Sequence, residues 1–141
     1  MRNTLSFLPL LRGVVLLFLL PLFLLVGCSP HPASGEWQVV AGSRMQGEHG
    51  ANFDRLLVHY NGRAEIFAAQ AAGGSELFRC FWAAAAVSSG ATATASLNCK
   101  QASEPDNTYY YLLDITASQA ALSRDGVVLG SWQKTATPIK D

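Results

Sequence analysis

The sequence predicts an all-β fold: a small antiparallel meander of eight strands or an up-and-down barrel, preceded by an apolar amino-terminal helix. Three observations predict it: short runs of strand-forming residues between turn residues, turn dipeptides at hairpin spacing, and two cysteines equidistant from a third turn. The predicted strands are 37–41, 56–60, 63–68, 76–84, 92–98, 108–116, 119–124 and 127–133. Closure into a barrel would remove the exposed edges of a flat sheet.

The amino-terminal segment 14–26 is apolar apart from a break at Pro21. Arg2 and Arg12 precede it with no acidic residue, which is typical of a secretory signal peptide. The alternative is a membrane-spanning helix, which needs about 20 continuous apolar residues. Residues 5–11 are also apolar, so an uncleaved anchor with Arg12 at the membrane surface stays open. Both alternatives hold the chain on a membrane.

The end of this segment, Leu25-Val26-Gly27-Cys28, resembles the lipobox of bacterial lipoprotein precursors. In that class the cysteine thiol takes a diacylglyceryl group, a peptidase cuts before the cysteine, and the new amino terminus usually gains a third acyl chain. The resemblance implies a signal peptide over 1–27, lipidation at Cys28 and a lipidated tether over 28–35. Ser29 in the next position implies export to the outer membrane, on its periplasmic face.

Cleavage before Cys28 would leave about 114 residues, enough for one domain. We expect the β-barrel-like domain to span 36–141. Loss of Arg2 and Arg12 leaves eight basic against ten acidic residues, a formal charge of −2. Because no run of lysine or arginine occurs, we expect no nucleic-acid partner and no binding of anionic lipid headgroups by a polybasic segment.

Two turn dipeptides predict hairpins. Asn61-Gly62 joins 56–60 to 63–68, and Asp125-Gly126 joins the last two predicted strands. Both dipeptides favour the type I′ turn, because its two central residues need positive φ. Consecutive hairpins predict antiparallel order.

The cysteines other than Cys28 are Cys80 and Cys99, and a pair in an exported domain predicts a disulfide. If Ser89-Gly90 is a two-residue turn, facing residues have numbers that sum to 179, so Cys80 lies opposite Cys99. The same register sets Trp82 opposite a leucine on the same face of the hairpin. Counting from the turn predicts a hydrogen-bonded cysteine pair with Cα atoms about 5.5 Å apart.

The alanine run 83–86 leaves two alternatives. We expect it to continue the strand, with a bulge that relieves the cysteine geometry. A single helical turn is the alternative, because alanine is the best helix former.

Aromatic residues are the candidate binding residues. In a strand, Tyr109 and Tyr111 lie on one face and Tyr110 on the other, so one face is core and Tyr110 is either a cross-strand packing residue or a surface hot spot. Gly35-Glu36-Trp37 resembles the opening of many lipocalin-like barrels, a two-residue likeness that carries no ligand pocket with it. Trp37 joins the tyrosines as a candidate binding residue.

The sequence predicts no catalytic site, no metal site and no cofactor. The serines lack a nucleophile-elbow context, and His31, His49 and His59 are scattered. No phosphate loop or dinucleotide fingerprint occurs. We expect His59 to be a packed or solvated side chain, because a catalytic base needs an orienting partner.

The resulting hypothesis is a lipid-anchored bacterial envelope lipoprotein whose disulfide-bonded β-domain binds another envelope or periplasmic protein and has no enzymatic activity. The alternatives are a barrel that binds a small apolar ligand and a purely structural envelope role. The predicted architecture is similar to that of periplasmic lysozyme inhibitors, although no residue here matches their inhibitory motif.

Overall fold

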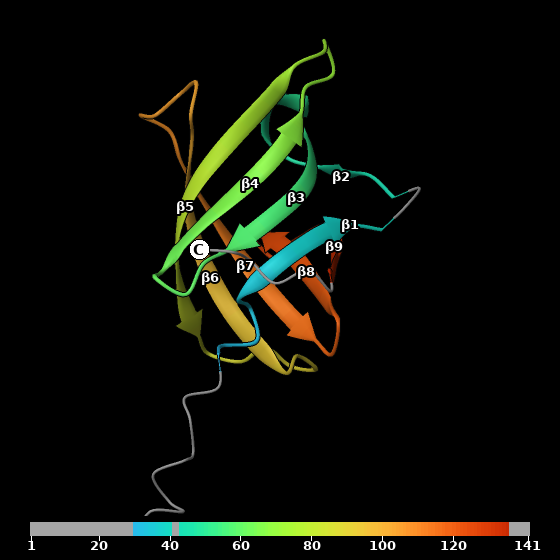
Figure 1. Cartoon of the computed structure of the whole chain (residues 1–141), viewed down its shortest axis with the longest axis vertical. Helices are drawn as coiled ribbons and strands as arrows, with labels where there is room; N and C mark the ends of the chain where they lie inside the picture. The colour runs from blue at the N-terminus through green and yellow to red at the C-terminus, as the bar shows by residue number, and fades with distance from the viewer. Residues whose placement is uncertain (1–29, 41–42, 136–141) are drawn as a thin grey trace, which may run out of the picture.

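A computed structural model describes residues 30–40 and 43–135 (Figure 1). These residues contain nine strands and one short 3-10 helix, joined by turns and loops. The predicted signal peptide and Cys28 lie outside these residues. The elements are β1 (Gly35–Val39), β2 (Met45–Gln46), η1 (Glu48–Gly50), β3 (Asn52–Val58), β4 (Arg63–Ala69), β5 (Ser75–Ala85), β6 (Ala93–Gln101), β7 (Thr108–Thr116), β8 (Gln119–Arg124) and β9 (Val127–Lys134).

The strands form one antiparallel sheet in the order β1-β9-β8-β7-β6-β5-β4-β3-β2, and β1 also pairs with β3. This second pairing closes eight strands into a barrel, with β2 as an extra strand beside β3. The prediction of an eight-stranded antiparallel barrel is therefore confirmed. Within the described residues no helix is long and apolar enough to cross a bilayer.

The predicted strands 108–116 and 119–124 match β7 and β8. By contrast, β3 begins at Asn52, earlier than predicted, and β2 and η1 were not expected from the sequence. Asn52 and Asp54 are residues that strands disfavour. Burial of Phe53, which is 2% exposed, outweighs that preference. The pairing of β3 with β4 shifts register between Phe53 and Arg55, so Asp54 has no partner on β4.

The two turn predictions had different outcomes. Asp125 and Gly126 have φ of 51° and 79°, which confirms a type I′ turn between β8 and β9. Asn61-Gly62 lies in the predicted hairpin between β3 and β4, but the type I′ turn expected there is wrong. The backbone N–H of His59 donates to the carbonyl of Arg63, which leaves a three-residue connection. Only Gly62 there has positive φ, and the side-chain oxygen of Asn61 accepts from the Arg63 N–H instead.

The disulfide and its register are confirmed. Cys80 and Cys99 are cross-strand partners joined by a disulfide, and Trp82 faces Leu97 as predicted. Their Cα separation of 4.0 Å corrects the expected hydrogen-bonded pair, since it fits the closer, non-hydrogen-bonded type. The ladder ends at Ala85, so alternation counted from the turn does not carry through residues 86–92.

The alanine run belongs to the strand as far as Ala85. Pairing from Phe78 to Ala85 shows no register shift, so the predicted bulge is absent from this ladder and so is the helical alternative. A bulge is unnecessary, because the directly opposed cysteines form the disulfide without any register shift.

Aromatic rings fill the inside of the barrel. Phe53 lies 5.2 Å from Phe78, 6.0 Å from Tyr111 and 6.5 Å from Trp132 between ring centres. The largest fully buried side chains are those of Trp37, Trp132, Phe53, Phe78, Met45, Leu56, Ile66, Leu97, Leu113, Ile115, Leu122 and Val58. The interior is therefore a packed hydrophobic core.

The packed part of the chain starts just before β1. Ala33 is 0% exposed, and its carbonyl accepts a 2.8 Å hydrogen bond from the indole Nε1 of Trp37. At the other end of the barrel Met45 of β2 lies against Gly130 of β9, where an added Cβ would be 3.0 Å from the Met45 Cγ. Glycine at this position lets β2 approach β9 closely.

Candidate functional site

Three large apolar side chains project outward from the two strands that flank β6. Phe81 of β5 is 70% exposed, and Tyr110 and Leu112 of β7 are 65% and 44% exposed. Between these strands, Asn98 of β6 pairs with both Phe81 and Tyr110, so Phe81, Asn98 and Tyr110 form one row across the sheet. We call Phe81, Asn98, Tyr110 and Leu112 the aromatic surface.

The aromatic surface lines an open hollow of about 570 Å³ on the outside of the barrel. Asp125 and Gly126 of the β8–β9 turn line the same hollow. Its volume falls in the range of ligand sites, about 300–1,000 Å³, and apolar walls with a few polar groups are typical of binding surfaces. The chain thus exposes aromatic side chains where a partner can contact them.

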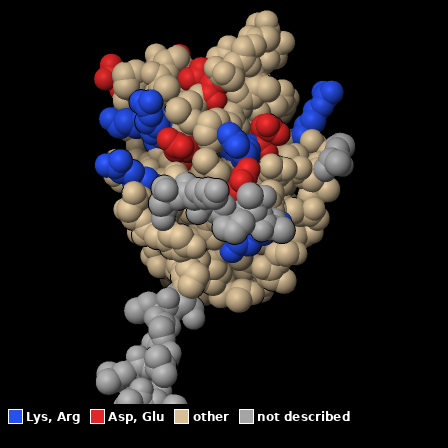
Figure 2. All heavy atoms as spheres, viewed as in Figure 1, with Lys and Arg blue, Asp and Glu red and all other residues tan. Residues whose placement is uncertain are grey.

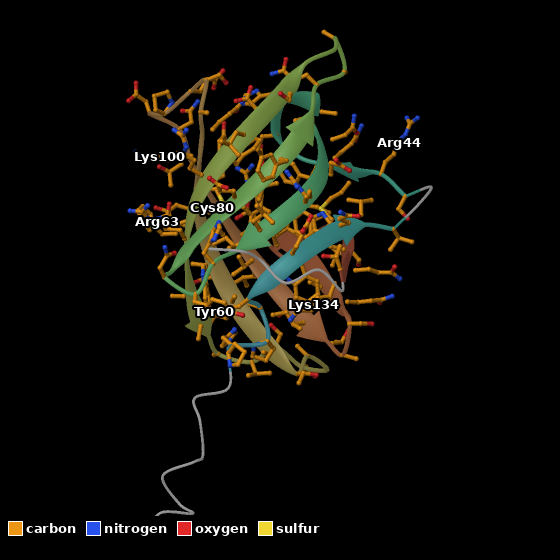
Figure 3. All side chains as sticks on the ribbon, in the orientation of Figure 1. Arg44, Tyr60, Arg63, Cys80, Lys100 and Lys134 are labelled. Carbon is orange, nitrogen blue, oxygen red and sulfur yellow. A yellow bond between two sulfur atoms is a disulfide. The ribbon has the colours of Figure 1, made fainter. Side chains whose placement is uncertain are left out.

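Basic residues lie beside the aromatic surface. Arg63, Arg79 and Lys100 are exposed on β4, β5 and β6, and we call them the basic cluster. Arg63 pairs with Phe81, and Arg79 pairs with Lys100 across the β5–β6 ladder. Lys and Arg side chains gather at the left edge in Figure 2, the side on which Figure 3 labels Arg63 and Lys100.

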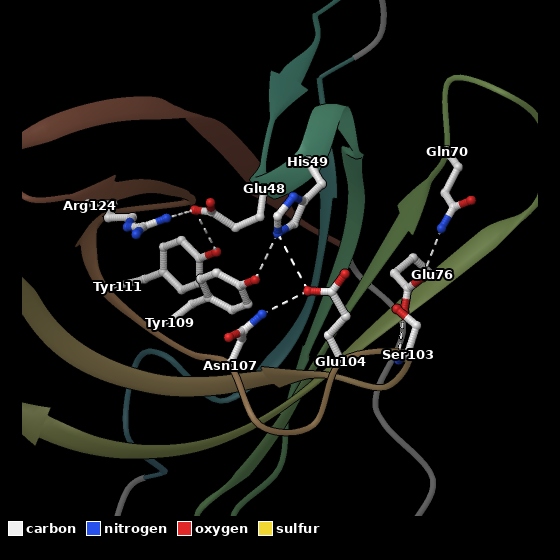
Figure 4. A network of polar contacts seen from close by, with 10 residues as sticks. All are labelled: Glu48, His49, Gln70, Glu76, Ser103, Glu104, Asn107, Tyr109, Tyr111 and Arg124. Atoms are coloured by element: carbon white, nitrogen blue, oxygen red, sulfur yellow. Dashed lines mark hydrogen bonds and ion pairs between the residues drawn. The ribbon is translucent and has the colours of Figure 1, made fainter.

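A polar network covers one end of the barrel (Figure 4). Glu48 of η1 forms an ion pair with Arg124 of β8, and the hydroxyl of Tyr111 donates to the Glu48 Oε1 at 3.4 Å. Burial, together with the Glu48 charge, raises the pKa of the Tyr111 phenol. The hydrogen bond to Glu48 raises the pKa of Arg124. These contacts hold η1 against β7 and β8.

His49 belongs to the same network. Its Nε2 lies 3.0 Å from the Tyr109 hydroxyl and 3.8 Å from the Glu104 carboxylate, which also accepts from the Asn107 amide. A proton relay would use the two imidazole nitrogens separately, whereas here a single nitrogen faces both groups. The His49 backbone has φ of 53°, so the network stabilises a turn that few residues other than glycine adopt.

Glu76 is the buried carboxylate of the barrel, at 7% exposure. Burial acts to raise its pKa, but hydrogen bonds from Ser103, Gln101 and Gln70 outweigh that effect and lower the pKa. The Gln70 amide donates at 2.8 Å and the Ser103 backbone N–H at 3.2 Å. Glu76 therefore ties the β4–β5 turn to the loop after β6.

No family model, curated protein or solved structure matches this chain. Over residues 30–40 and 43–135, no three His, Cys, Asp or Glu side chains are grouped to hold a metal ion. The candidate site is therefore inferred from the chain's own geometry.

The structure separates the candidate binding residues. Tyr109 and Tyr111 are buried, at 7% and 2% exposure, and Tyr110 faces outward, as strand alternation predicts. Trp37 is 0% exposed and contributes to the core. His59 is half-buried, with its Nε2 3.9 Å from the Glu65 carboxylate.

Sequence reasoning missed Phe81, Leu112 and the basic cluster. The cysteine register already implied Phe81 and the two members of the basic cluster on β5 and β6, because residues that alternate with the inward-facing cysteines must face outward. Phe81 follows Cys80, and its predicted partner across the hairpin is Asn98. The sequence signal for these residues is therefore the alternation of faces along the hairpin.

Proposed function

We propose that this chain is a lipid-anchored bacterial envelope lipoprotein whose β-domain binds another envelope or periplasmic protein through the aromatic surface. The observation that supports it is the outward exposure of Phe81 and Tyr110, at 70% and 65%, in one row with Asn98. Protein interfaces are enriched in aromatic residues, and such side chains carry most of the binding energy when a partner buries them.

The packed interior favours the outer surface as the binding site. Trp37, Trp132, Phe53 and Phe78 occupy the volume in which a ligand-carrying barrel would hold its cargo. The hollow lined by Tyr110, in contrast, opens on the outside of the sheet. Partner binding therefore accounts for the exposed rings better than carriage of a small apolar ligand.

The anchor in this proposal rests on the lipobox resemblance at Cys28. The packed domain begins at Ala33, and the few residues between the two positions span about 20 Å at most when extended. Two or three acyl chains would hold the protein stably on a bilayer. A domain on so short a tether would meet partners that lie at the same membrane.

Photocrosslinking in the producing cells tests partner binding. Benzoylphenylalanine replaces Tyr110 in the full-length chain, and a control places it at Tyr60, which is 60% exposed and does not line the hollow. We expect a discrete adduct with one exported protein from position 110 and none from position 60. Phe81→Ala should reduce the adduct. Equal adducts from both positions, or none from position 110, would contradict the proposal.

Intact mass tests the anchor. We expect wild-type protein extracted from membranes to start at Cys28 and carry acyl chains, whereas Cys28→Ala should remain uncleaved and unmodified. A wild-type mass equal to that of the full unmodified chain would rule out lipidation without bearing on the aromatic surface.

A further inference from the structure

The basic cluster contains an unfavourable pair. Arg79 of β5 and Lys100 of β6 are direct cross-strand partners, and both are exposed. Like charges directly opposite in a ladder destabilise the sheet. Arg63 adds a third positive charge on the neighbouring strand, where it pairs with Phe81. The fold thus concentrates positive charge beside its most exposed aromatic ring.

Within the described residues, no member of the basic cluster forms an ion pair. Glu65 is the cross-strand partner of Arg79, yet its carboxylate lies 3.9 Å from His59 and no described carboxylate lies within 4.0 Å of Arg79. Two other arginines of the barrel are paired: Arg55 with Glu36 at 3.6 Å, and Arg124 with Glu48. The basic cluster therefore differs from these two arginines in lacking an ion-pair contact among the described residues.

Two further hollows open at the basic cluster. Arg79, Phe81, Lys100 and Pro105 line one of about 460 Å³. Arg63, Arg79 and Phe81, together with Glu65, line another of about 290 Å³, where two positive charges face one carboxylate. Both hollows are lined by Phe81 together with residues of the basic cluster. A ligand for them would combine negative charge with an apolar group.

We propose that the partner presents an acidic, aromatic-containing peptide segment to this surface. Its carboxylates would pair with Arg63, Arg79 and Lys100, and its apolar side chains would pack on Phe81 and Tyr110. Arginine forks bind carboxylates in bidentate geometry, which also fixes the orientation of a bound segment. This inference rests on the proposed function and specifies the chemistry of its partner.

A peptide segment suits the surroundings better than an anionic bilayer does. Asp125 lines the hollow at Tyr110, and exposed Glu104 and Asp106 follow Lys100 in the next loop. A flat anionic surface that reached Lys100 would also approach these carboxylates and be repelled. A narrow segment can contact the basic cluster and avoid them.

Binding of defined peptides tests the proposal. The probe is a peptide of about ten residues with both termini blocked, and it combines several glutamates with two phenylalanines. The control peptide has glutamine in place of each glutamate. The full-length protein in detergent is titrated against each peptide by fluorescence anisotropy. We expect saturable binding of the glutamate peptide, weakened about two- to fivefold by Arg79→Gln, as exposed ion pairs imply. Added salt should weaken it further.

Arg44→Gln is the matched control, because Arg44 is exposed and lies on the opposite side of the barrel in Figure 3. It removes the same charge and should leave peptide binding unchanged. The proposal is overturned by equal binding of the two peptides, by no saturable binding, or by equal effects of the two variants. Competition by phosphatidylglycerol vesicles that depends on Arg79 would overturn it in favour of a lipid surface.

The two proposals fail separately. In the photocrosslinking experiment, the triple variant with glutamine at Arg63, Arg79 and Lys100 should lose most of the adduct from position 110. An undiminished adduct in that variant would leave protein binding intact and overturn the acidic segment. Absence of the adduct from position 110 even when the basic cluster is intact would contradict protein binding itself.

Discussion

Trp37 and Trp132 are both 0% exposed, but only one of them has a hydrogen-bond partner. The indole Nε1 of Trp37 donates to the Ala33 carbonyl at 2.8 Å. That of Trp132 is buried with no partner among the described residues. Trp37→Phe and Trp132→Phe remove the same atoms from equally buried positions. Comparison of the two variants therefore sets the loss of a satisfied donor against the loss of an unsatisfied one.

The difference in the free energy of unfolding follows from this arrangement. Trp37→Phe leaves the Ala33 carbonyl without its donor, and an unsatisfied buried polar group costs about 1–3 kcal/mol. Trp132→Phe removes a donor that is already unsatisfied and so recovers a cost of similar size. The loss of packing is common to both variants. Because the two effects have opposite signs, we expect Trp37→Phe to be the more destabilising by about 2–6 kcal/mol.

Urea unfolding followed by far-UV circular dichroism measures this difference, on oxidised chains that begin at Ser29. Trp82→Phe is a third variant, because its half-buried indole donates to the His59 carbonyl at 2.7 Å and water can replace part of that bond. We expect its cost to fall below that of Trp37→Phe. If Trp132→Phe destabilises the protein as much as Trp37→Phe at equal m values, the reasoning is refuted.

Three other predictions concern stability. Reduction of the Cys80–Cys99 disulfide, with its sequence separation of 19, should cost about 3 kcal/mol in urea unfolding, and the double alanine variant should be insensitive to reductant. Because the folded-state pKa of Glu76 lies below its ordinary value of 4.5, its contribution to stability is present above that pH and is lost as pH falls through the lowered pKa. Glu76→Gln should therefore flatten the acid limb of a stability profile recorded from about pH 6 down to about pH 2, and an unchanged limb would contradict this role. Gly47→Ala should lower the melting temperature strongly, since its Cβ would lie 2.2 Å from the buried Phe53 ring, and a wild-type melting temperature would show that the ring can move.

Local patterns in the sequence were sufficient to predict most of the barrel. Strand alternation placed Tyr109 and Tyr111 inside and Tyr110 outside. A hairpin centred on Ser89-Gly90 predicted the pairing of the two disulfide cysteines. Asp125-Gly126 determined its turn because both residues must adopt positive φ. In each case the geometry is decided within one strand or one hairpin.

Features that depend on distant contacts were not predictable in this way. β2 pairs with β3. It also approaches β9 closely, because Gly130 leaves room for the Met45 side chain. The Glu48–Arg124 ion pair joins residues far apart in the sequence. Asn61-Gly62 failed as a type I′ signal because the pairing of β3 with β4 leaves three residues in the connection. Tertiary packing outweighed local preference at these positions.

The position of β1 between β3 and β9 has a mechanical consequence. Gly35 to Gln38 pair with β3, and Trp37 to Val39 pair with β9, so the strand is held on both sides. Hydrogen bonds in antiparallel ladders run perpendicular to the strands. A pull along β1 from the amino-terminal side therefore loads two ladders in shear, and several bonds must break together. The first strand of the domain is therefore expected to resist being pulled out of the barrel by a force applied at the amino-terminal side.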